Sequence, residues 1–430
     1  MRTLLFSAFT AVALLQLLVA STTLCWMLDG WRTPRALKRT RFPAPGVPRL
    51  SFTLIVPARH EEAVLGDTLD RLATADHPYV EVLAVVGHDD EGTQRTAEAA
   101  AQRHDRVRVV IDSNWPKNKP KALNTALPLC RGDVIGVFDA EDEVAHGLLL
   151  HVDTLFQATG ADVVQGGVQL MNFQTSWWSL RNVLEYYFWF RSRLHFHARK
   201  RFIPLGGNTV FIRRPLLEEV DGWDADCLAE DCELGVRLSA RGARVAVAYA
   251  PELATREETP DSLRALYKQR TRWNQGFLQV LRKGEWRRLP TRRQRTLAWY
   301  TLAMPFVQAF AGVMIPVSLV TALKVKAPVT LVLLQFLPVI PTFVTVAIET
   351  VALRQFCSAY GLRARLLDYL RLVLGAFFYQ LVLAAAALRA TVRELRGVRT
   401  WEKTTHIGAH RAGETPGMNS GVARPAEDAA

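Results

Sequence analysis

The chain has 430 residues, enough for one large domain and additional membrane segments. Its formal net charge is +12, but the basic residues gather beside long apolar stretches, which is typical of a membrane protein and argues against a nucleic-acid-binding protein. The five cysteines are scattered and odd in number, which argues against a disulfide framework.

The N-terminal segment is predicted to be a membrane anchor. The stretch from Leu4 to Leu28 is almost wholly apolar and long enough to cross a bilayer. A cleaved signal peptide is the alternative, but the apolar part is long for one, Arg2 is the only charge before it, and a basic cluster follows it. We therefore predict an uncleaved anchor over residues 1–28 with its N-terminus outside the cell, then a basic, proline-rich linker over residues 29–49 in the cytoplasm.

Residues 50–290 are predicted to fold as one cytoplasmic α/β domain. Apolar strands alternate with helices there, which is typical of a mostly parallel, doubly wound sheet. The expected strands are 51–57, 80–86, 107–111, 134–138 and 163–170. The glycine fingerprint of dinucleotide-binding folds and the P-loop are both absent from the sequence, so a bound nucleotide would be held by carboxylates and a metal.

Carboxylates follow two of these expected strands. Asp89 and Asp90 come after the second strand, and Asp139 and Glu141 come after the fourth. Because ligands bind at the carboxyl ends of parallel strands, this pattern indicates a site for a nucleotide diphosphate and a divalent metal. An acidic loop that only caps the following helix is the alternative.

A helix dense in aromatic residues is expected over about residues 176–201. Its C-terminal end is basic, and aromatic residues beside basic ones suit a membrane interface. An ordinary core helix with a basic end is the alternative. We interpret His195 and His197, which lie in this helix, as interfacial residues and not as ligands.

Three later stretches are candidates for binding or chemistry. The loop Gly206–Thr209 could bring backbone close to a substrate. Glu230 and Asp231 begin a helix, where N-terminal capping alone would explain them. The stretch 267–276 places two arginines beside a tryptophan, although on its own it could be a solvated basic helix.

Taken together, these features resemble the membrane-bound family 2 glycosyltransferases, a group that includes the cellulose, chitin and hyaluronan synthases and a bacterial exopolysaccharide branch. The resemblance covers roughly residues 50–280, and the order and spacing of the motifs carry it. The matching stretches are Val56-Pro-Ala-Arg-His-Glu-Glu62, Asp89-Asp90, Lys119-Pro-Lys-Ala-Leu-Asn124, Asp139-Ala-Glu141, Ala229-Glu230-Asp231, Gln269-Arg-Thr-Arg272-Trp273 and Trp401-Glu-Lys403-Thr404. The resemblance implies a glycosyltransferase A-like (Rossmann-like) domain with a mostly parallel sheet, together with transmembrane helices.

The resemblance also implies a role for each matched residue. Asp231 stands where the family has its general base, and Asp139 and Glu141 stand where the family binds Mg²⁺ or Mn²⁺. The implied nucleotide-binding residues are Pro57, Arg59, Glu61, Asp89, Asp90, Lys119, Asp139 and Arg272. The implied acceptor-binding residues are Gly207, Asn208, Glu230, Gln269 and Trp273.

Three departures from the family pattern bear on these roles. Glu141 replaces the second aspartate of the metal motif, which keeps the charge on a longer side chain. Ala229 replaces a threonine before the base, which removes a hydroxyl. The loop Gly206–Thr209 does not specify an acceptor.

The activity implied by the resemblance is inverting, metal-dependent transfer from a nucleotide-diphosphate sugar, a UDP-sugar by resemblance, onto a growing polysaccharide. The intact motif that ends at Trp273 favours processive polymerisation. Single-sugar transfer to a lipid-linked acceptor and a catalytically dead scaffold or export partner are the alternatives. The expected partners are the nucleotide sugar, a polysaccharide or lipid-linked acceptor, membrane lipids and accessory export proteins, without nucleic acid. The expected location is the bacterial plasma membrane, crossed several times.

Residues 296–391 are predicted to hold two to three transmembrane helices. The candidate stretches are 297–323, 328–353 and the shorter 372–388. With the anchor, three spans would place the C-terminus outside, whereas the basic segment 392–411 and its Trp-x-Lys-Thr element belong near the cytoplasmic site. One apolar stretch is therefore expected to lie in the interface or to re-enter. Residues 412–430 are expected to be disordered.

Overall fold

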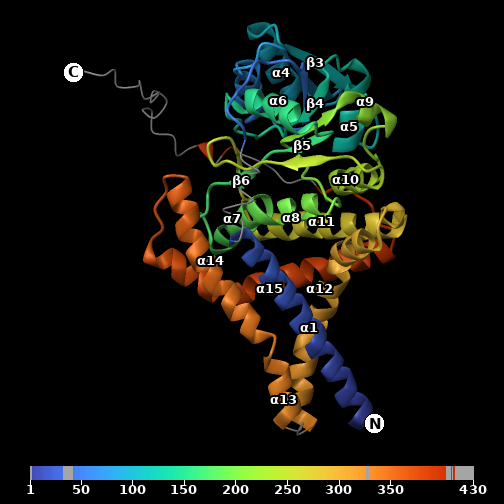
Figure 1. Ribbon diagram of the computed structural model, residues 1–430, viewed down its shortest axis with the longest axis vertical. Helices are drawn as coiled ribbons and strands as arrows, with labels where there is room; N and C mark the ends of the chain where they lie inside the picture. The colour runs from blue at the N-terminus through green and yellow to red at the C-terminus, as the bar shows by residue number, and fades with distance from the viewer. Residues whose placement is uncertain (1, 32–41, 326–328, 403–407, 409, 412–430) are drawn as a thin grey trace, which may run out of the picture.

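A seven-stranded sheet organises the N-terminal half of the chain (Figure 1). The strand order is β3-β2-β1-β4-β7-β5-β8; β7 runs antiparallel to both of its neighbours, and the other pairs are parallel. The strands are β1 (Phe52–Ala58), β2 (Val80–Gly87), β3 (Val107–Asp112), β4 (Val134–Val137), β5 (Val163–Gln165), β7 (Val210–Arg213) and β8 (Val245–Val247). The predicted mostly parallel α/β domain is confirmed. The computed structural model describes residues 2–31, 42–325, 329–402, 408 and 410–411.

The single strand predicted over residues 163–170 is wrong. The chain breaks after β5, and β6 (Val168–Leu170) pairs with β9 (Thr255–Glu257) in a separate two-stranded sheet. Two glycines form the break: a Cβ atom on Gly166 would lie 2.6 Å from a methyl carbon of Thr209, and one on Gly167 would lie 2.6 Å from the Tyr249 ring. This close approach of distant segments leaves no room for side chains at the break.

Helices cover both faces of the main sheet. They are α3 (Leu65–Ala73), α4 (Glu91–Arg103), α5 (Lys119–Ala126), α6 (Leu148–Thr159), α9 (Arg214–Glu219) and α10 (Glu230–Ala240), with a short 3₁₀ turn over Leu127–Leu129. Alternate residues of β1 enter two separate cores: Ile55 packs in one, and Leu54 and Val56 pack in the other. A strand buried on both faces requires this continuous apolar run, which is why β1 lacks a polar face.

Below the sheet lies a layer of helices that run across the molecule (Figure 1). In it, α7 (Trp177–Phe188), a π-helical turn (Trp189–Arg193) and α8 (Leu194–Arg199) form one helical segment, close to the helix predicted over residues 176–201. The position of this segment at a membrane surface stays a prediction. In the same layer, α11 (Leu263–Lys283) lies along α15 (Leu366–Leu395), and a short 3₁₀ turn over Glu285–Arg288 follows α11.

Four helices in the described part of the chain are long and apolar enough to cross a membrane. The candidate spans lie in α1 (Arg2–Trp31), α12 (Arg292–Val325), α14 (Val339–Ala359) and α15. In Figure 1, α1, α12, α13 (Val329–Phe336) and α14 extend away from the sheet domain, whereas α15 lies across their upper end. Pro338 separates α13 from α14 within the stretch predicted as one span.

After α15 the chain returns toward the α/β domain. The side-chain amide of Gln275 in α11 donates a hydrogen bond of 2.6 Å to the carbonyl of Val398, and Arg393 donates one of 3.0 Å to the Gln275 side chain. The segment after α15 therefore lies on the side of the sheet domain. Lys403 and Thr404 of the Trp-x-Lys-Thr element and the tail 412–430 lie outside the described residues.

Candidate active site

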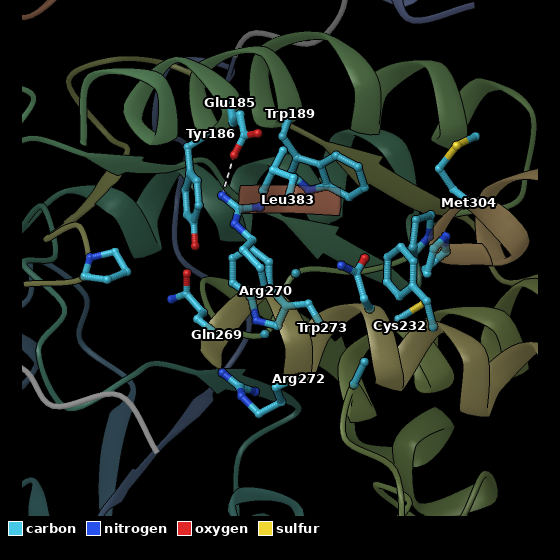
Figure 2. Close-up of a pocket in the computed structure, with 18 of the residues that line it drawn as sticks. Glu185, Tyr186, Trp189, Cys232, Gln269, Arg270, Arg272, Trp273, Met304 and Leu383 are labelled. Carbon is cyan, nitrogen blue, oxygen red and sulfur yellow. Dashed lines mark hydrogen bonds and ion pairs between the residues drawn. The ribbon is translucent and has the colours of Figure 1, made fainter. Parts of the chain in front are cut away.

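A cavity of about 1400 Å³ joins the carboxyl ends of the sheet strands to the membrane helices. Figure 2 shows part of it, with Glu185, Tyr186 and Trp189 on one side and α11 on the other. The predicted site residues that line the cavity are Pro57, Arg59, Glu61, Lys119, Asp139, Glu141, Gly207, Asn208, Glu230, Asp231, Gln269, Arg272 and Trp273. Residues that are far apart in the sequence thus meet at one site.

Asp89 and Asp90 are the predicted site residues that do not line the cavity. Asp89 forms two hydrogen bonds of 2.8 and 3.0 Å with the guanidinium of Arg59, and this contact holds the pKa of the Asp89 carboxyl well below its usual range. Asp90 accepts a hydrogen bond of 2.6 Å from the backbone N–H of His60 and caps α4 through Thr93. These carboxylates hold the turn after β1, and Arg59 borders the cavity.

Lys119 joins three parts of the site. It lies in the first turn of α5, whose N-cap is Asn118, and its ammonium forms an ion pair with Asp139 at the end of β4. The same ammonium donates a hydrogen bond of 2.9 Å to the carbonyl of Gly207. Burial lowers the pKa of Lys119, but the nearby carboxylates of Asp139 and Glu230 outweigh burial and raise it. Lys119 is therefore a fixed cation at the centre of the cavity.

Two adjacent carboxylates begin α10 and face this centre. Asp231 accepts a hydrogen bond of 2.7 Å from the backbone N–H of Cys232, and its other carboxylate oxygen would lie 3.2 Å from a Cβ atom placed on Gly207. Burial raises the pKa of Asp231. Burial and the neighbouring Asp231 raise the pKa of Glu230 to about 7. Both carboxyls therefore hold a proton more readily than free carboxyls do.

One face of α11 supplies the predicted motif residues Gln269, Arg272 and Trp273, which helical spacing places together (Figure 2). The Arg272 guanidinium lies 4.6 Å from the ring centre of Trp401 in the C-terminal segment. Within the described residues, Gln269 Oε1 and Arg272 Nε are buried without a hydrogen-bond partner. A flat ring and unsatisfied polar groups in a cavity suit a sugar or phosphate ligand.

Ala229, which stands where the family has a threonine, lies in a closely packed position. A Cβ atom on Gly276 of α11 would lie 2.4 Å from the Ala229 Cβ and 2.6 Å from its nitrogen. The start of α10 therefore packs directly on the α11 backbone. A small residue at position 229 fits this close contact, and Asp231 keeps its place beside the cavity.

The cavity offers some of the ligands that a hard divalent cation needs. Asp139 and Glu141 line the cavity and offer carboxylate oxygens, the ligands that Mg²⁺ and Mn²⁺ prefer. Behind them the Asn208 amide donates hydrogen bonds to the carboxylates of Asp142 and Glu257. Within the described residues, no group of three or more His, Cys, Asp or Glu side chains is placed to hold a metal ion. The chain therefore offers two carboxylates, and other ligands would have to come from substrate or water.

Sequence analysis missed three residues that line the same cavity: Asp112, Lys117 and Glu257. Asp112 ends β3, so the strand-end rule that identified Asp139 would have found it, and Lys117 forms an ion pair of 3.5 Å with it. Glu257 lies in β9; burial and the nearby Glu141 and Asp139 raise its pKa to about 8. No local pattern marks Glu257, because its neighbours are distant in sequence.

Arg411, at the end of the described chain, contacts the loop Asp139–Glu141, called here the metal-motif loop. Arg411 donates hydrogen bonds of 3.0 Å to the carbonyl of Glu141 and 2.7 Å to the hydroxyl of Thr68, which itself donates to the carbonyl of Ala140. Arg411 also bonds the carbonyl of Val64 at 3.0 Å. The C-terminal segment thus touches the site at both ends, through Trp401 and through Arg411.

Comparisons with known proteins agree with this geometry. The beta-monoglucosyldiacylglycerol synthase of Trichormus variabilis is 26% identical over 377 residues, which cover 83% of this chain and 76% of the relative. The poly-beta-1,6-N-acetyl-D-glucosamine synthase of Staphylococcus epidermidis is 21% identical over 282 residues, which cover 64% of this chain and 66% of the relative. Among three similar beta-monoglucosyldiacylglycerol synthases, the matched part spans 49% to 76% of the relative's own length.

The fold agrees with a solved mannosyltransferase from Pyrobaculum calidifontis in complex with GDP-Man and Mn²⁺. The TM-score is 0.58 at 20% identity, and the match covers 91% of this chain and 99% of that one. The sheet domain is therefore glycosyltransferase A-like. The family model described as "Glycosyltransferase like family 2" matches residues 48–276, which include the strands, Lys119, Asp139, Asp231 and Trp273. The chain belongs to glycosyltransferase family 2 and is a glycosyltransferase that uses a nucleotide sugar.

Proposed function

We propose that this chain transfers one sugar from a nucleotide-diphosphate sugar to a hydroxyl group of a membrane lipid, with inversion at the anomeric carbon. The observation that carries the proposal is the continuity of the cavity. It runs from Asp231 and Lys119 to side chains of the candidate membrane helices. An acceptor that reaches Asp231 through this cavity needs a polar end and an apolar body.

The part of the cavity between the candidate membrane helices has walls that suit the apolar body of a lipid. Apolar side chains there come from α1, α14 and α15; they include Val19, Val339, Phe343, Val346, Phe377 and Leu381. Apolar walls suit acyl chains better than the hydroxyl groups of a long glycan. The glycolipid-synthase relatives support the same acceptor class.

The described residues can perform the displacement in one step. Asp231 takes the proton of the acceptor hydroxyl as that oxygen bonds to the anomeric carbon, and the bond to the nucleoside diphosphate breaks on the opposite face. Lys119 and Arg272 stabilise the negative charge that develops on the leaving diphosphate. Asp139 and Glu141 would hold Mg²⁺ or Mn²⁺, which supplies further positive charge at the diphosphate when bound.

Processive polysaccharide synthesis is the second candidate. The assembled Gln269, Arg272 and Trp273 and the poly-N-acetylglucosamine synthase relatives favour it. Accessory export proteins would then be partners. A dead scaffold is disfavoured because Lys119, Asp139 and Asp231 are brought together at one cavity. A bacterial plasma membrane location with a cytoplasmic catalytic domain accords with the basic residues that flank the membrane helices.

The test is nucleoside diphosphate release by the full chain in lipid nanodiscs, from a panel of UDP- and GDP-sugars with Mg²⁺ or Mn²⁺. We expect release from one donor, and we expect Asp231→Asn to abolish it while donor binding stays near normal. Asp226→Asn, an exposed neighbour, is the matched control and should stay active. An active Asp231→Asn enzyme would contradict the assignment of Asp231 as the general base.

The same reaction identifies the acceptor class. A radiolabelled donor should give a solvent-extractable lipid that carries one sugar. Labelled material that stays in the aqueous phase as long chains would instead establish the polymerase. Release without any glycosylated product would point to a missing acceptor.

A further inference from the structure

The π-helical turn Trp189–Arg193 carries an arginine, Arg193, that forms no ion pair with the described residues. Within the described residues, no hydrogen bond or ion pair involves the Arg193 side chain, and its Nε is buried. The guanidinium instead lies between two indoles, 4.0 Å from the ring centre of Trp26 and 5.0 Å from that of Trp189. Such π-helical turns occur frequently at functional sites.

The neighbouring carboxylates are already engaged with other cations. Glu185, two turns before Arg193, forms an ion pair with Arg270. Asp29 on α1 forms an ion pair with Arg199. Burial lowers the pKa of Arg193 to about 10, so the group still carries its charge at neutral pH. An anion from outside the described chain would complete this arrangement, because even a half-buried cation without a counter-ion is costly.

A hydroxyl that lines the same cavity as Arg193 also lacks a partner. Within the described residues, Thr301 Oγ1 is buried without a hydrogen-bond partner. Its neighbour Tyr300 meets the same Trp26 ring edge-on, at 5.8 Å between centroids, which places this part of α12 against α1. Thr301, Arg193 and both indoles line the cavity. A cation and a hydroxyl that line one cavity suit a phosphate group.

The part of the cavity around Arg193 lies where α1 meets the helices under the sheet. The Ser192 hydroxyl donates a hydrogen bond of 3.0 Å to the carbonyl of Trp26, which fixes this end of α1. Apolar cavity walls continue from here along α1 through Val19 and Leu15. Tryptophan and arginine at the end of an apolar helix mark the depth of lipid headgroups.

We propose that Arg193, with Thr301, binds the phosphate of a membrane phospholipid whose acyl chains enter the apolar part of the cavity. This site is separate from the catalytic carboxylates, and it holds whether the acceptor is a lipid or a glycan. The cavity then takes a phospholipid at its membrane edge beside the path of the acceptor.

The test is native mass spectrometry of the full chain in detergent, titrated with phosphatidylglycerol or with diacylglycerol, which lacks the phosphate. We expect Arg193→Gln to weaken phosphatidylglycerol binding by about tenfold or more, the value of a hydrogen-bonded charge pair. Diacylglycerol binding should not change. Lys200→Gln, which removes the same charge from an exposed position on this segment, should bind phosphatidylglycerol like the parent.

Two further variants keep the test decisive if Arg193→Gln does not fold. Arg193→Lys should retain part of the affinity, because it keeps the charge but loses the planar fork. Thr301→Val should lower the affinity several-fold without a change of charge. Equal phosphatidylglycerol affinity in all variants would overturn the proposal. Competition by inorganic phosphate at equal concentration would also overturn it, because the site would then bind free phosphate. The readout does not depend on sugar transfer, so failure here leaves the proposed function standing.

Discussion

At the scale of single residues, Glu230 and Asp231 show how two adjacent carboxylates can act as one proton-binding unit. Glu230 is buried and Asp231 is half-buried at the start of α10, and Asp231 disfavours ionisation of Glu230 because like charges repel. Lys119 offsets part of that repulsion. The result is that the pKa of each carboxyl lies above its usual value.

The raised pKa of Asp231 predicts an acid limit to the rate. Burial raises this pKa, so the proposed base takes up a proton, and transfer slows, as the pH falls through the raised value. We expect kcat/KM for transfer to begin to fall at a higher pH than the ordinary pKa of an aspartate would give. Glu230→Gln removes the neighbouring carboxyl, whose pKa is about 7, so the fall that remains in this variant belongs to Asp231. Rate profiles from about pH 4 to 8.5 check this, and a rate that stays constant down to about pH 4 would contradict a raised pKa of Asp231.

At the scale of elements, the C-terminal segment links the membrane half to the metal-motif loop. It leaves α15 beside α11, places Trp401 over Arg272 and reaches α3 and the Glu141 carbonyl through Arg411. These contacts join residues near the end of the described chain to residues in its first and middle parts. Through Arg411, the segment is therefore positioned to restrict the motion of the loop that carries Asp139 and Glu141.

Arg411→Ala tests this link. Loss of the hydrogen bonds to the loop backbone should raise the apparent KM for the donor about fivefold to tenfold, with a smaller change in kcat. The melting temperature should change little, because few apolar contacts are lost. Arg396→Ala, an exposed arginine after α15, is the control and should keep the parent KM. A loss of kcat alone would instead indicate that Arg411 acts in the chemical step.

At the scale of the whole molecule, the packing of α15 bears on the conflict between span number and tail charge. It is long and apolar enough to cross a membrane, yet it lies along α11, which carries the motif residues of the catalytic domain. Arg282 of α11 forms an ion pair of 2.9 Å with Glu394 of α15. We infer that α15 lies in the interface and that the described segment Arg396–Glu402 after it stays on the catalytic side.

Cysteine labelling in spheroplasts tests this topology. The background is Cys25→Ser, since the other native cysteines are buried. We expect Asp226→Cys in the catalytic domain and Arg396→Cys after α15 to react with an impermeant maleimide only after lysis. Lys324→Cys, at the far end of α12, should react in intact spheroplasts. Labelling of Arg396→Cys before lysis would show that α15 crosses the membrane.

Local patterns in the sequence determined much of this protein. Continuous apolar runs identified β1 to β4, because a strand buried on both faces has no polar side, but they did not identify the short strands β7, β8 and β9. Helical spacing placed Gln269, Arg272 and Trp273 on one face of α11. Carboxylates at strand ends located the cavity, because the carboxyl ends of parallel strands share one edge. Length and hydropathy marked α1, α12, α14 and α15.

Tertiary structure decided what depends on distant partners. The break at Gly166 follows from its contact with Thr209, and the place of Asp90 follows from its bond to His60. The same apolar composition allows α15 either to span the membrane or to lie beneath α11, and its packing against both α11 and α12 appears only in the tertiary structure. Arg193 looks like any interfacial arginine until Trp26 is brought beside it. Local sequence fixes the period and charge of an element, whereas its partners are set by contacts across the whole chain.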